Sequence, residues 1–378
     1  MDFELTEEQK MLQSMVRDFT VNEIEPRAAE IDQTEQFPHD LFKRFAEMEL
    51  FGLFCPPEYG GSDMGFIAMV LVEEQIAQSS AMLAGWIHGQ NGAVRRVHLY
   101  GTDEQKQKYL APLARGEILA CQAFTEPETG SDPKAILTTA KLVGDEYVLN
   151  GEKRFITRAS VAQIAVIYAK TEDGRVSAFL VETNTPGFST GPVWDKMGWR
   201  GSDTRDVFLD DVRIPRGNLL GKLGHGYQIL MEGTATGKLG WSATGIGLTQ
   251  AALDESIKYA KERMYRGRPI AELLNIQGLL AEITAKLEAS RWLTYRGAWL
   301  KDQGVDALQV SQALALAKFF SSTSSVDAIR QAMQIHGAYG VMKDFKIERL
   351  YRDVKFAEVV EGNVEIQRVI IAHNLLRE

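Results

Sequence analysis

The spacing of hydrophobic and polar residues changes twice along the chain. In residues 1–118, apolar positions such as Leu12 and Val16 recur with a period near 3.6 residues, which is typical of amphipathic helices. Thr6, followed by acidic residues, is suited to begin the first helix. The stretch CPPEYGGSDM interrupts the pattern, and DEQKQKYLAPLARGE predicts a further helix that stops at Gly116.

From residue 119 to 224 the apolar runs become short, β-branched and aromatic, as in EYVLNGEKRFI, QIAVIYAKT, VSAFLVETN and RDVFLDDVRI. No helix of 10–15 residues separates them, so we expect an antiparallel β domain. Residues 225–378 return to long helical patterns joined by short loops. The predicted fold is therefore α+β and mostly α: an N-terminal helical domain (1–118), an antiparallel β domain (119–224) and a C-terminal four-helix bundle (225–378).

Composition narrows the class of protein. The 378 residues are 45% hydrophobic and 25% charged, which is the balance of a folded protein with several domains. A net charge of −9 argues against binding to nucleic acid or anionic membranes. We expect neither a signal peptide nor membrane insertion, and a cytoplasmic location. Two cysteines, Cys55 and Cys121, suggest a reducing compartment, and the six histidines lack metal-binding spacing.

Two stretches of the β domain concentrate groups that can bind a ligand. In CQAFTEPETGSD, the residues Thr125, Gly130 and Ser131 supply hydrogen-bond donors in one loop, which suits a phosphate, the pyrimidine edge of a flavin, or only an ordered turn. In NGEKRFITRAS, Phe155 and Thr157 lie two residues apart on a strand and so share a face. An ordinary half-buried strand has the same pattern.

Two further stretches lie in the C-terminal region. KERMYRGRPIAELLNIQ is predicted as a helix interrupted by Gly267 and Pro269. Its arginines suit either a diphosphate or a solvated corner; they are Arg263, Arg266 and Arg268. QIHGAYGV contains Gly337, which permits close approach of a ligand or forms a structural turn.

A fifth stretch, YRDVKFAEVVEGNVEIQR, contains three carboxylates, Glu358, Glu361 and Glu365, among apolar residues. On a surface helix they would be unremarkable. Held in an apolar cleft that excludes water, a carboxylate becomes a stronger base and a candidate proton acceptor.

The order and spacing of these stretches resemble the acyl-CoA dehydrogenase family over nearly the whole chain. FTEPETGSD resembles the family's TEPxAGSD loop, LNGEKRFITRAS its NGxKxWITNA segment, YAKERMYRGRPI its YxxxRxQFGxPI segment and VVEGNVEIQR its IYEGTSEIQR segment. The resemblance implies an FAD-dependent enzyme that oxidises an acyl-CoA thioester to the 2,3-enoyl-CoA. It also implies a homotetramer that passes electrons to an electron-transfer flavoprotein.

The resemblance assigns roles to individual residues. Glu361 matches the catalytic base that removes the α-proton while flavin N5 accepts the β-hydride. The matching FAD contacts are Phe124, Thr125, Gly130, Ser131, Phe155, Thr157, Arg263, Arg266, Gln334, Gly337, Ala338, Asn363 and Glu365. The matching substrate contacts are His88, Asn91, Ser131, Lys238 and Gly362. In the family the arginine that Arg263 matches reaches the FAD diphosphate across a subunit interface.

The chain departs from the family pattern at several of these positions. Arg266 replaces a phenylalanine, Leu274 a glutamine, Ala338 a glycine, and Asn363 a threonine or serine. We expect FAD to bind nonetheless, with Arg266 as an additional diphosphate contact. Some relatives carry their base at the position of Gly237, where glycine cannot serve. For Glu358 and Glu365 we expect structural or exposed positions rather than catalysis.

The stretch GWIHGQNGAVRRVH matches the helix that closes the acyl cavity in relatives. His88 and Asn91 would make this end polar and favour a short, branched, cyclic or functionalised acyl group; alternatively, Asn91 caps the N-terminus of a helix. We expect Arg95 and Arg96 to face solvent or a neighbouring subunit, or one of them to pair with a dicarboxylic acyl group. An acyl-CoA oxidase, a flavin monooxygenase of the same fold and a non-catalytic paralogue remain alternative functions.

Overall fold

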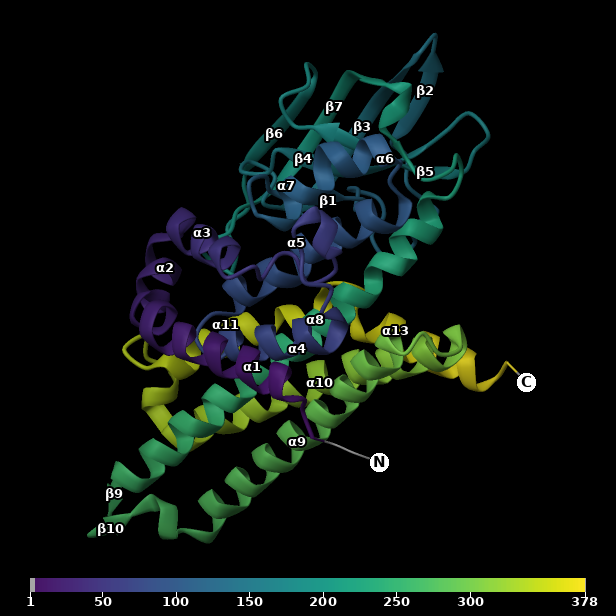
Figure 1. Ribbon diagram of the computed structural model, residues 1–378. Helices are drawn as coiled ribbons and strands as arrows, with labels where there is room; N and C mark the ends of the chain where they lie inside the picture. Colours follow the sequence, from purple (N-terminus) through teal and green to yellow (C-terminus); the bar gives the residue numbers. More distant parts are fainter. Residues whose placement is uncertain (1–3, 378) are drawn as a thin grey trace.

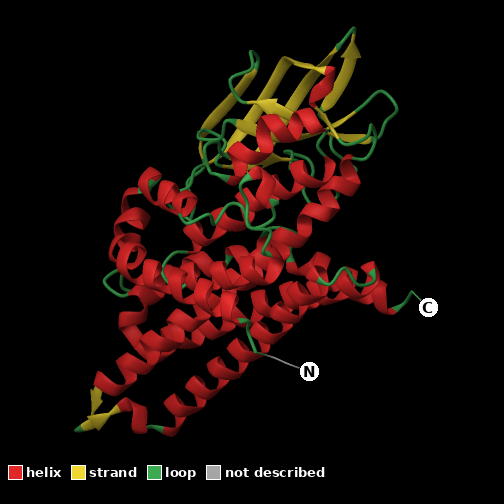
Figure 2. Ribbon diagram, viewed as in Figure 1, coloured by secondary structure: helices red, strands yellow, loops and turns green. Residues whose placement is uncertain are grey.

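A β-sheet domain lies at one end of the molecule, and two sets of helices pack together below it (Figure 1). The computed structural model describes residues 4–377. Figure 2 shows that the strands gather at one end of the molecule, apart from a small hairpin at the opposite tip, and in the sequence the gathered strands lie between Ala120 and Leu220. The predicted fold class, with helical, β and helical parts in this order, is confirmed.

The N-terminal helices form around two buried segments. Thr6 caps α1: its hydroxyl accepts a hydrogen bond from the Gln9 N–H, and the Gln9 side chain accepts from the Thr6 N–H, as a capping box requires. Helices α4 and α5 are buried over most of their length and carry the side chains nearest to the C-terminal bundle. The helices are α1 Glu7–Phe19, α2 Ala28–Thr34, α3 His39–Glu47, α4 Gly65–Ala77, α5 Ala81–Tyr100, α6 Asp103–Gln105 and α7 Ala111–Ala114.

The sheet has the strand order β6-β7-β3-β2-β4-β5-β8, with β1 added beside β4. Most pairs are antiparallel as expected, but β1 and β2 both pair with β4 in parallel, so the sheet is mixed. A parallel pair requires a long connection, and the β2–β3 hairpin supplies it between β1 and β4. The strands are β1 Ala120–Ala123, β2 Thr139–Val143, β3 Glu146–Thr157, β4 Ile164–Lys170, β5 Val176–Glu182, β6 Phe188–Val193, β7 Thr204–Pro215 and β8 Leu219–Leu220.

Three long helices form the C-terminal region, as their hydrophobic spacing predicts. The interrupted helix expected in KERMYRGRPI is wrong: α8 ends at Glu262 and a β-hairpin follows. Arg266 and Gly267 turn this hairpin with φ of 51° and 83°, the left-handed pair that tight hairpins require. The elements are α8 Gly226–Glu262, β9 Met264–Tyr265, β10 Arg268–Pro269, α9 Leu274–Asp302, α10 Ala307–His336, α11 Lys346–Val354, α12 Phe356–Val359 and α13 Val364–Leu375.

Small residues let α5 and α8 approach each other closely. A Cβ atom added at Gly233 or Gly240 of α8 would overlap a side chain of α5, because the two glycines lie directly beneath Arg96 and His88. Gly237, which lies between these two glycines along α8, faces Glu361 in the loop between α12 and α13, and we call this stretch of α8 and its neighbours the seam. Within residues 4–377, no helix is both long and apolar enough to cross a bilayer.

Candidate functional site

Glu361 lies where the C-terminal helical segment breaks. Its φ of 54° and the φ of 77° at Gly362 place two consecutive residues in the left-handed region, which separates α12 from α13. A non-glycine residue in this region is strained by about 1–2 kcal/mol, and such strain concentrates at functional sites. The carboxylate packs onto α8: a Cβ added at Gly237 would lie 2.4 Å from Glu361 Oε2. Glycine at 237 therefore makes the room that the carboxylate occupies.

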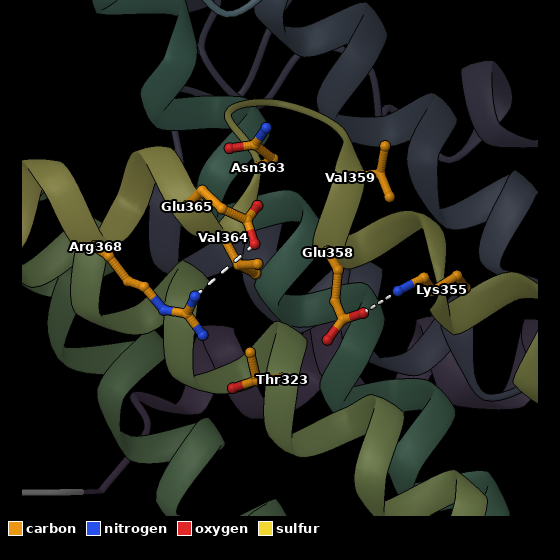
Figure 3. A pocket seen from close by; sticks show the side chains of 8 residues that line it. All are labelled: Thr323, Lys355, Glu358, Val359, Asn363, Val364, Glu365 and Arg368. Atoms are coloured by element: carbon orange, nitrogen blue, oxygen red, sulfur yellow. Dashed lines mark hydrogen bonds and ion pairs between the residues drawn. The ribbon is translucent and has the colours of Figure 1, made fainter.

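The two neighbouring carboxylates have different surroundings. Glu358 and Glu365 line a surface pocket of about 350 Å³ between α10, α12 and α13 (Figure 3). Lys355 donates a hydrogen bond to Glu358, and Arg368 lies 3.8 Å from Glu365. Both carboxylates are thus paired with surface cations, whereas Glu361 faces the seam between helices.

Asn363 begins α13 as its N-cap. Its side-chain oxygen accepts a hydrogen bond of 2.9 Å from the Ile366 N–H, and the Gly362 carbonyl accepts one of 2.8 Å from the Gln367 side chain. Asparagine, threonine and serine all serve as N-caps, so the departure from the family pattern at this position preserves the local structure.

Two buried lysines accompany Glu361. Burial lowers the pKa of Lys238 in α8 to about 8 and that of Lys318 in α10 to about 7, while the Glu361 carboxylate favours the charged form of each. Lys318 also donates a hydrogen bond to the Ala357 carbonyl in α12, which ties α10 to the segment that carries Glu361. Sequence inspection missed Lys318, although a lysine inside the apolar run ALALAKFF is the kind of signal that marks it.

Aromatic rings fill the seam on the other side of Gly237. Trp199 stacks on Trp241 of α8 with ring centroids 4.3 Å apart, and a Cβ at Gly85 of α5 would lie 2.0 Å from the Trp199 ring. The backbone N–H of Trp199 donates to Asp353, at 2.7 Å, and so fixes this left-handed residue (φ 56°). Neither tryptophan was a sequence candidate, because only the packing of the β6–β7 loop, which carries Trp199, against α5 and α8 brings them together.

His88 lies beside these rings and is buried. Its Nδ1 is 3.0 Å from Oε2 of Glu73 in α4, and a Cβ at Gly240 would overlap its imidazole. Burial raises the pKa of Glu73 despite the opposing effect of His88. The predicted polar end of the seam is therefore a buried histidine–glutamate pair.

Asn91 has a different position from either one expected. It lies in the middle of α5, whose N-cap is Ser80, and is fully buried. Its amide donates to the Leu50 carbonyl at 2.8 Å and its oxygen accepts from the Leu53 N–H at 3.0 Å. The side chain therefore satisfies the backbone of a buried turn, and the N-cap interpretation is wrong.

The neighbouring arginines diverge. Arg95 pairs with Glu232 of α8 at 2.8 Å, whereas Arg96 is only 6% exposed. The expectation that both face solvent or another subunit is wrong for Arg96, because Gly92 and Gly233 leave an interior space that its guanidinium fills.

In the β domain, the predicted residues lie at one edge of the sheet, the edge formed by the C-terminal ends of β1 and β3. Phe124 and Thr125 follow β1, and the Thr125 carbonyl accepts a 2.8 Å hydrogen bond from the Arg154 N–H. A β-bulge between Lys153 and Ile156 turns Phe155 outward, where it is 56% exposed with φ 59°. Thr157 is half-buried, and Gly130 and Ser131 lie in an exposed loop.

Two features near this edge were not anticipated. The exposed ring of Trp194 lies 5.3 Å from that of Phe155 and extends the aromatic surface. Lys153, fully buried, donates to Glu126 at 2.8 Å and to the Tyr168 carbonyl at 2.6 Å. The loop that carries Thr125 is therefore anchored on strand β3 by the Glu126–Lys153 pair.

The remaining predicted cofactor residues lie far from this edge. Arg263 and Arg266 belong to the end of α8 and the β9–β10 hairpin, at the opposite tip of the molecule from the sheet (Figure 1). Gln334, Gly337 and Ala338, at the end of α10, are exposed, and Arg263 lies 5.7 Å from the ring of the adjacent Tyr339. One copy of the chain does not bring the two sets together.

Comparisons with known proteins cover the whole chain. Three family models match: the acyl-CoA dehydrogenase N-terminal domain at residues 6–117, middle domain at 121–212 and C-terminal domain at 224–376. A 3-(aryl)acrylate reductase of Clostridium sporogenes is 40% identical over 377 residues, 98% of this chain and 99% of the relative. A subunit of the caffeyl-CoA reductase-Etf complex of Acetobacterium woodii is 36% identical over 379 residues, 99% of each chain.

The fold agrees with solved structures at the same level. Butyryl-CoA dehydrogenase from Megasphaera elsdenii superposes with a TM-score of 0.97 at 31% identity, covering 100% of both chains. The chain therefore belongs to the acyl-CoA dehydrogenase family of FAD-dependent oxidoreductases.

Proposed function

We propose that this enzyme interconverts an acyl-CoA thioester and its 2,3-enoyl-CoA, with Glu361 as the base at the α-carbon. One observation carries the proposal: the Glu361 carboxylate occupies the space left by Gly237, inside the seam between α8 and the α12–α13 loop. In the saturating direction the protonated side chain returns the same proton, by microscopic reversibility.

The residues present fit FAD. Phe155 and Trp194 expose a pair of aromatic rings large enough for a flavin to stack upon, and the Thr125–Ser131 loop at the same edge offers hydroxyl and backbone donors. When bound, FAD supplies the acceptor for the β-hydride. Asn363 and Glu365 border the surface pocket near α13 and would contact the cofactor from that side.

Glu361 acts within an electrostatic cluster. Lys238 and Lys318 place two buried amines beside it, and the Glu361 carboxylate favours the charged form of each although burial lowers the pKa of both. Among residues 4–377, no acceptor takes the Glu361 N–H, because the left-handed break removes it from both helices. That N–H is free to donate to a thioester oxygen and stabilise the negative charge that develops there.

The acyl group that the seam accepts is compact. Trp199, Trp241 and His88 fill the space beyond Gly237, so a long straight chain would have to displace buried rings. The His88–Glu73 pair gives this end hydrogen-bonding capacity that a purely aliphatic group would leave unused. A short, branched, cyclic or aryl-bearing acyl group suits these walls, and relatives named as reductases of an arylacrylate and of caffeyl-CoA agree with the last.

The separation of the two sets of cofactor residues supports an oligomer. Arg263 and Gln334, near the tip that carries the β9–β10 hairpin, and Thr125, in the β domain, would serve a single FAD only if they come from different copies. We therefore propose a homotetramer in which each FAD lies between subunits, with Arg266 as an additional diphosphate contact. An electron-transfer flavoprotein is the proposed electron partner, because one close relative is a subunit of a reductase-Etf complex.

An anaerobic titration tests this function. The purified holoenzyme is mixed with butyryl-, isovaleryl-, cyclohexanoyl- and 3-phenylpropanoyl-CoA, and flavin absorbance near 450 nm is followed. Bleaching by at least one compact thioester, reversed by an electron-transfer flavoprotein, is the expected result. Rapid reoxidation by O₂ alone would indicate an oxidase or monooxygenase. No bleaching by any acyl-CoA, together with no reoxidation of dithionite-reduced flavin by any enoyl-CoA, would indicate a non-catalytic protein.

A further inference from the structure

Arg96 presents a buried positive charge that the chain itself does not neutralise. Among the residues that the structure describes, no carboxylate lies within ion-pair distance of its guanidinium, and its Nε has no hydrogen-bond partner. Arg95, the next residue along α5, is paired with Glu232. A buried arginine without an acid is costly, because desolvation of the charge is not compensated. An anion supplied from outside the chain would provide the compensation.

The surroundings of Arg96 are shaped around this charge. A Cβ at Gly233 of α8 would lie 2.0 Å from Nη2, so glycine at this position makes the room for the guanidinium, and a Cβ at Gly92 of α5 would lie 3.1 Å from Nη1. The hydroxyl of Tyr168, in β4, is also fully buried and lies beside the Arg96 guanidinium, with no other polar partner among the described residues. Two buried polar groups from different elements thus border one place, and neither of them carries the negative charge that Arg96 lacks.

The place lies beside the proposed base. Gly233, under Arg96, and Gly237, under Glu361, are four residues apart on α8, which corresponds to about 6 Å along the helix axis. The electrostatic influence of both Arg96 and Glu361 on Tyr168 agrees with this proximity. The two side chains therefore face neighbouring turns of α8, a separation that a substrate of a few bonds' length would span.

We propose that Arg96, assisted by Tyr168, binds a carboxylate of the substrate and makes the enzyme selective for acidic substrates. The proposal rests on the proposed function, because it places the substrate against the same stretch of α8 as Glu361. Two sources provide the same chemistry: a terminal carboxylate on the acyl chain of a CoA thioester, or the carboxylate of a free enoic acid in place of the thioester. A planar carboxylate can accept two parallel hydrogen bonds from a guanidinium.

Matched ligand pairs test the proposal with the FAD-loaded enzyme. The first pair is 4-carboxybutanoyl-CoA and its methyl ester; the second is (E)-2-butenoate and (E)-2-butenamide. Dissociation constants come from the change in flavin absorbance, so the test does not require turnover. We expect the wild-type enzyme to bind the charged member of at least one pair tenfold or more tightly, and the pair that shows the preference identifies the source.

Variants then assign the preference to Arg96. Arg96→Gln should abolish it and Arg96→Lys should retain part of it, while Arg95→Gln, the matched control on the same helix, should leave it intact. Tyr168→Phe should weaken it by a smaller factor. Should Arg96→Gln fail to retain FAD, the ligand preferences of the wild type and of Arg96→Lys still show whether Arg96 binds the carboxylate.

Equal binding of charged and neutral ligands by the wild type, or equal losses in the Arg95 and Arg96 variants, would overturn the proposal. Turnover of neutral acyl-CoA would leave the proposed function standing in that case.

Discussion

Gly237→Ala probes the position of the catalytic carboxylate without touching Glu361. The added Cβ would lie 2.4 Å from Oε2, 2.6 Å from Cδ and 2.8 Å from Cγ of Glu361. Unstrained contacts between such atoms need about 3.5 Å, so the carboxylate must retreat by about 1 Å. A misplacement of about 1 Å can cost about 10²-fold in rate. We therefore expect the rate of flavin bleaching by a good acyl-CoA to fall by about two orders of magnitude.

The same substitution should not weaken the fold through helix propensity, because alanine is favoured over glycine in a helix by about 1 kcal/mol. Gly278→Ala is the matched control: it lies in α9, and a Cβ there would meet nothing within 4 Å. Stopped-flow bleaching, FAD content and thermal denaturation are measured for both variants. A Gly237→Ala enzyme that folds, retains FAD and bleaches at the wild-type rate would refute the argument that Glu361 must occupy this space.

Three further substitutions test the surroundings of the site. Burial raises the pKa of Asp353 from 3.8 to about 6, so its ionisation opposes folding as pH rises from about 4 to 6. Asp353→Asn removes this ionisation. It should leave the free energy of unfolding unchanged at pH 4 and raise it by up to about 3 kcal/mol at pH 7. Equal gains in urea denaturation at both pH values would contradict this. Asn363→Ala removes the N-cap of α13 and should destabilise the protein by about 1 kcal/mol in the same assay, with Asn363→Ser recovering most of the loss. Glu126→Gln leaves Lys153 buried without its carboxylate and should cost about 3 kcal/mol and reduce FAD retention, and unchanged stability and FAD content would speak against an anchoring role.

The sequence predicts regular structure well where one face of an element is buried. Helices α9 and α10 begin and end within a few residues of the hydrophobic stretches that predict them, and four of the strands follow their apolar runs. The parallel pairing of β1 with β4 is not predictable in this way, because it depends on which strand lies alongside rather than on local spacing. The hairpin after Glu262 was missed because its turn uses Arg266, a residue that is rarely left-handed.

The candidate site divides along the same line. Glu361 and the Thr125 and Phe155 segments are found from motifs that are contiguous in the chain. Their physical support comes from distant residues: Gly237 receives the carboxylate, and Lys318 ties the neighbouring helix in place. A buried arginine and a solvated one look alike in sequence, so the interior position of Arg96 follows only from the packing of two helices through their glycines.

Glu361→Gln, beside Glu358→Gln, tests the central claim most directly. The glutamine keeps the shape of the side chain but cannot accept the α-proton, whereas the control carboxylate of Glu358 pairs with Lys355 at the surface. We predict that Glu361→Gln retains FAD but bleaches at least about 10²-fold more slowly with an acyl-CoA that reduces the wild-type enzyme, while the Glu358→Gln control bleaches normally. Wild-type bleaching by the FAD-loaded Glu361→Gln enzyme would contradict the account.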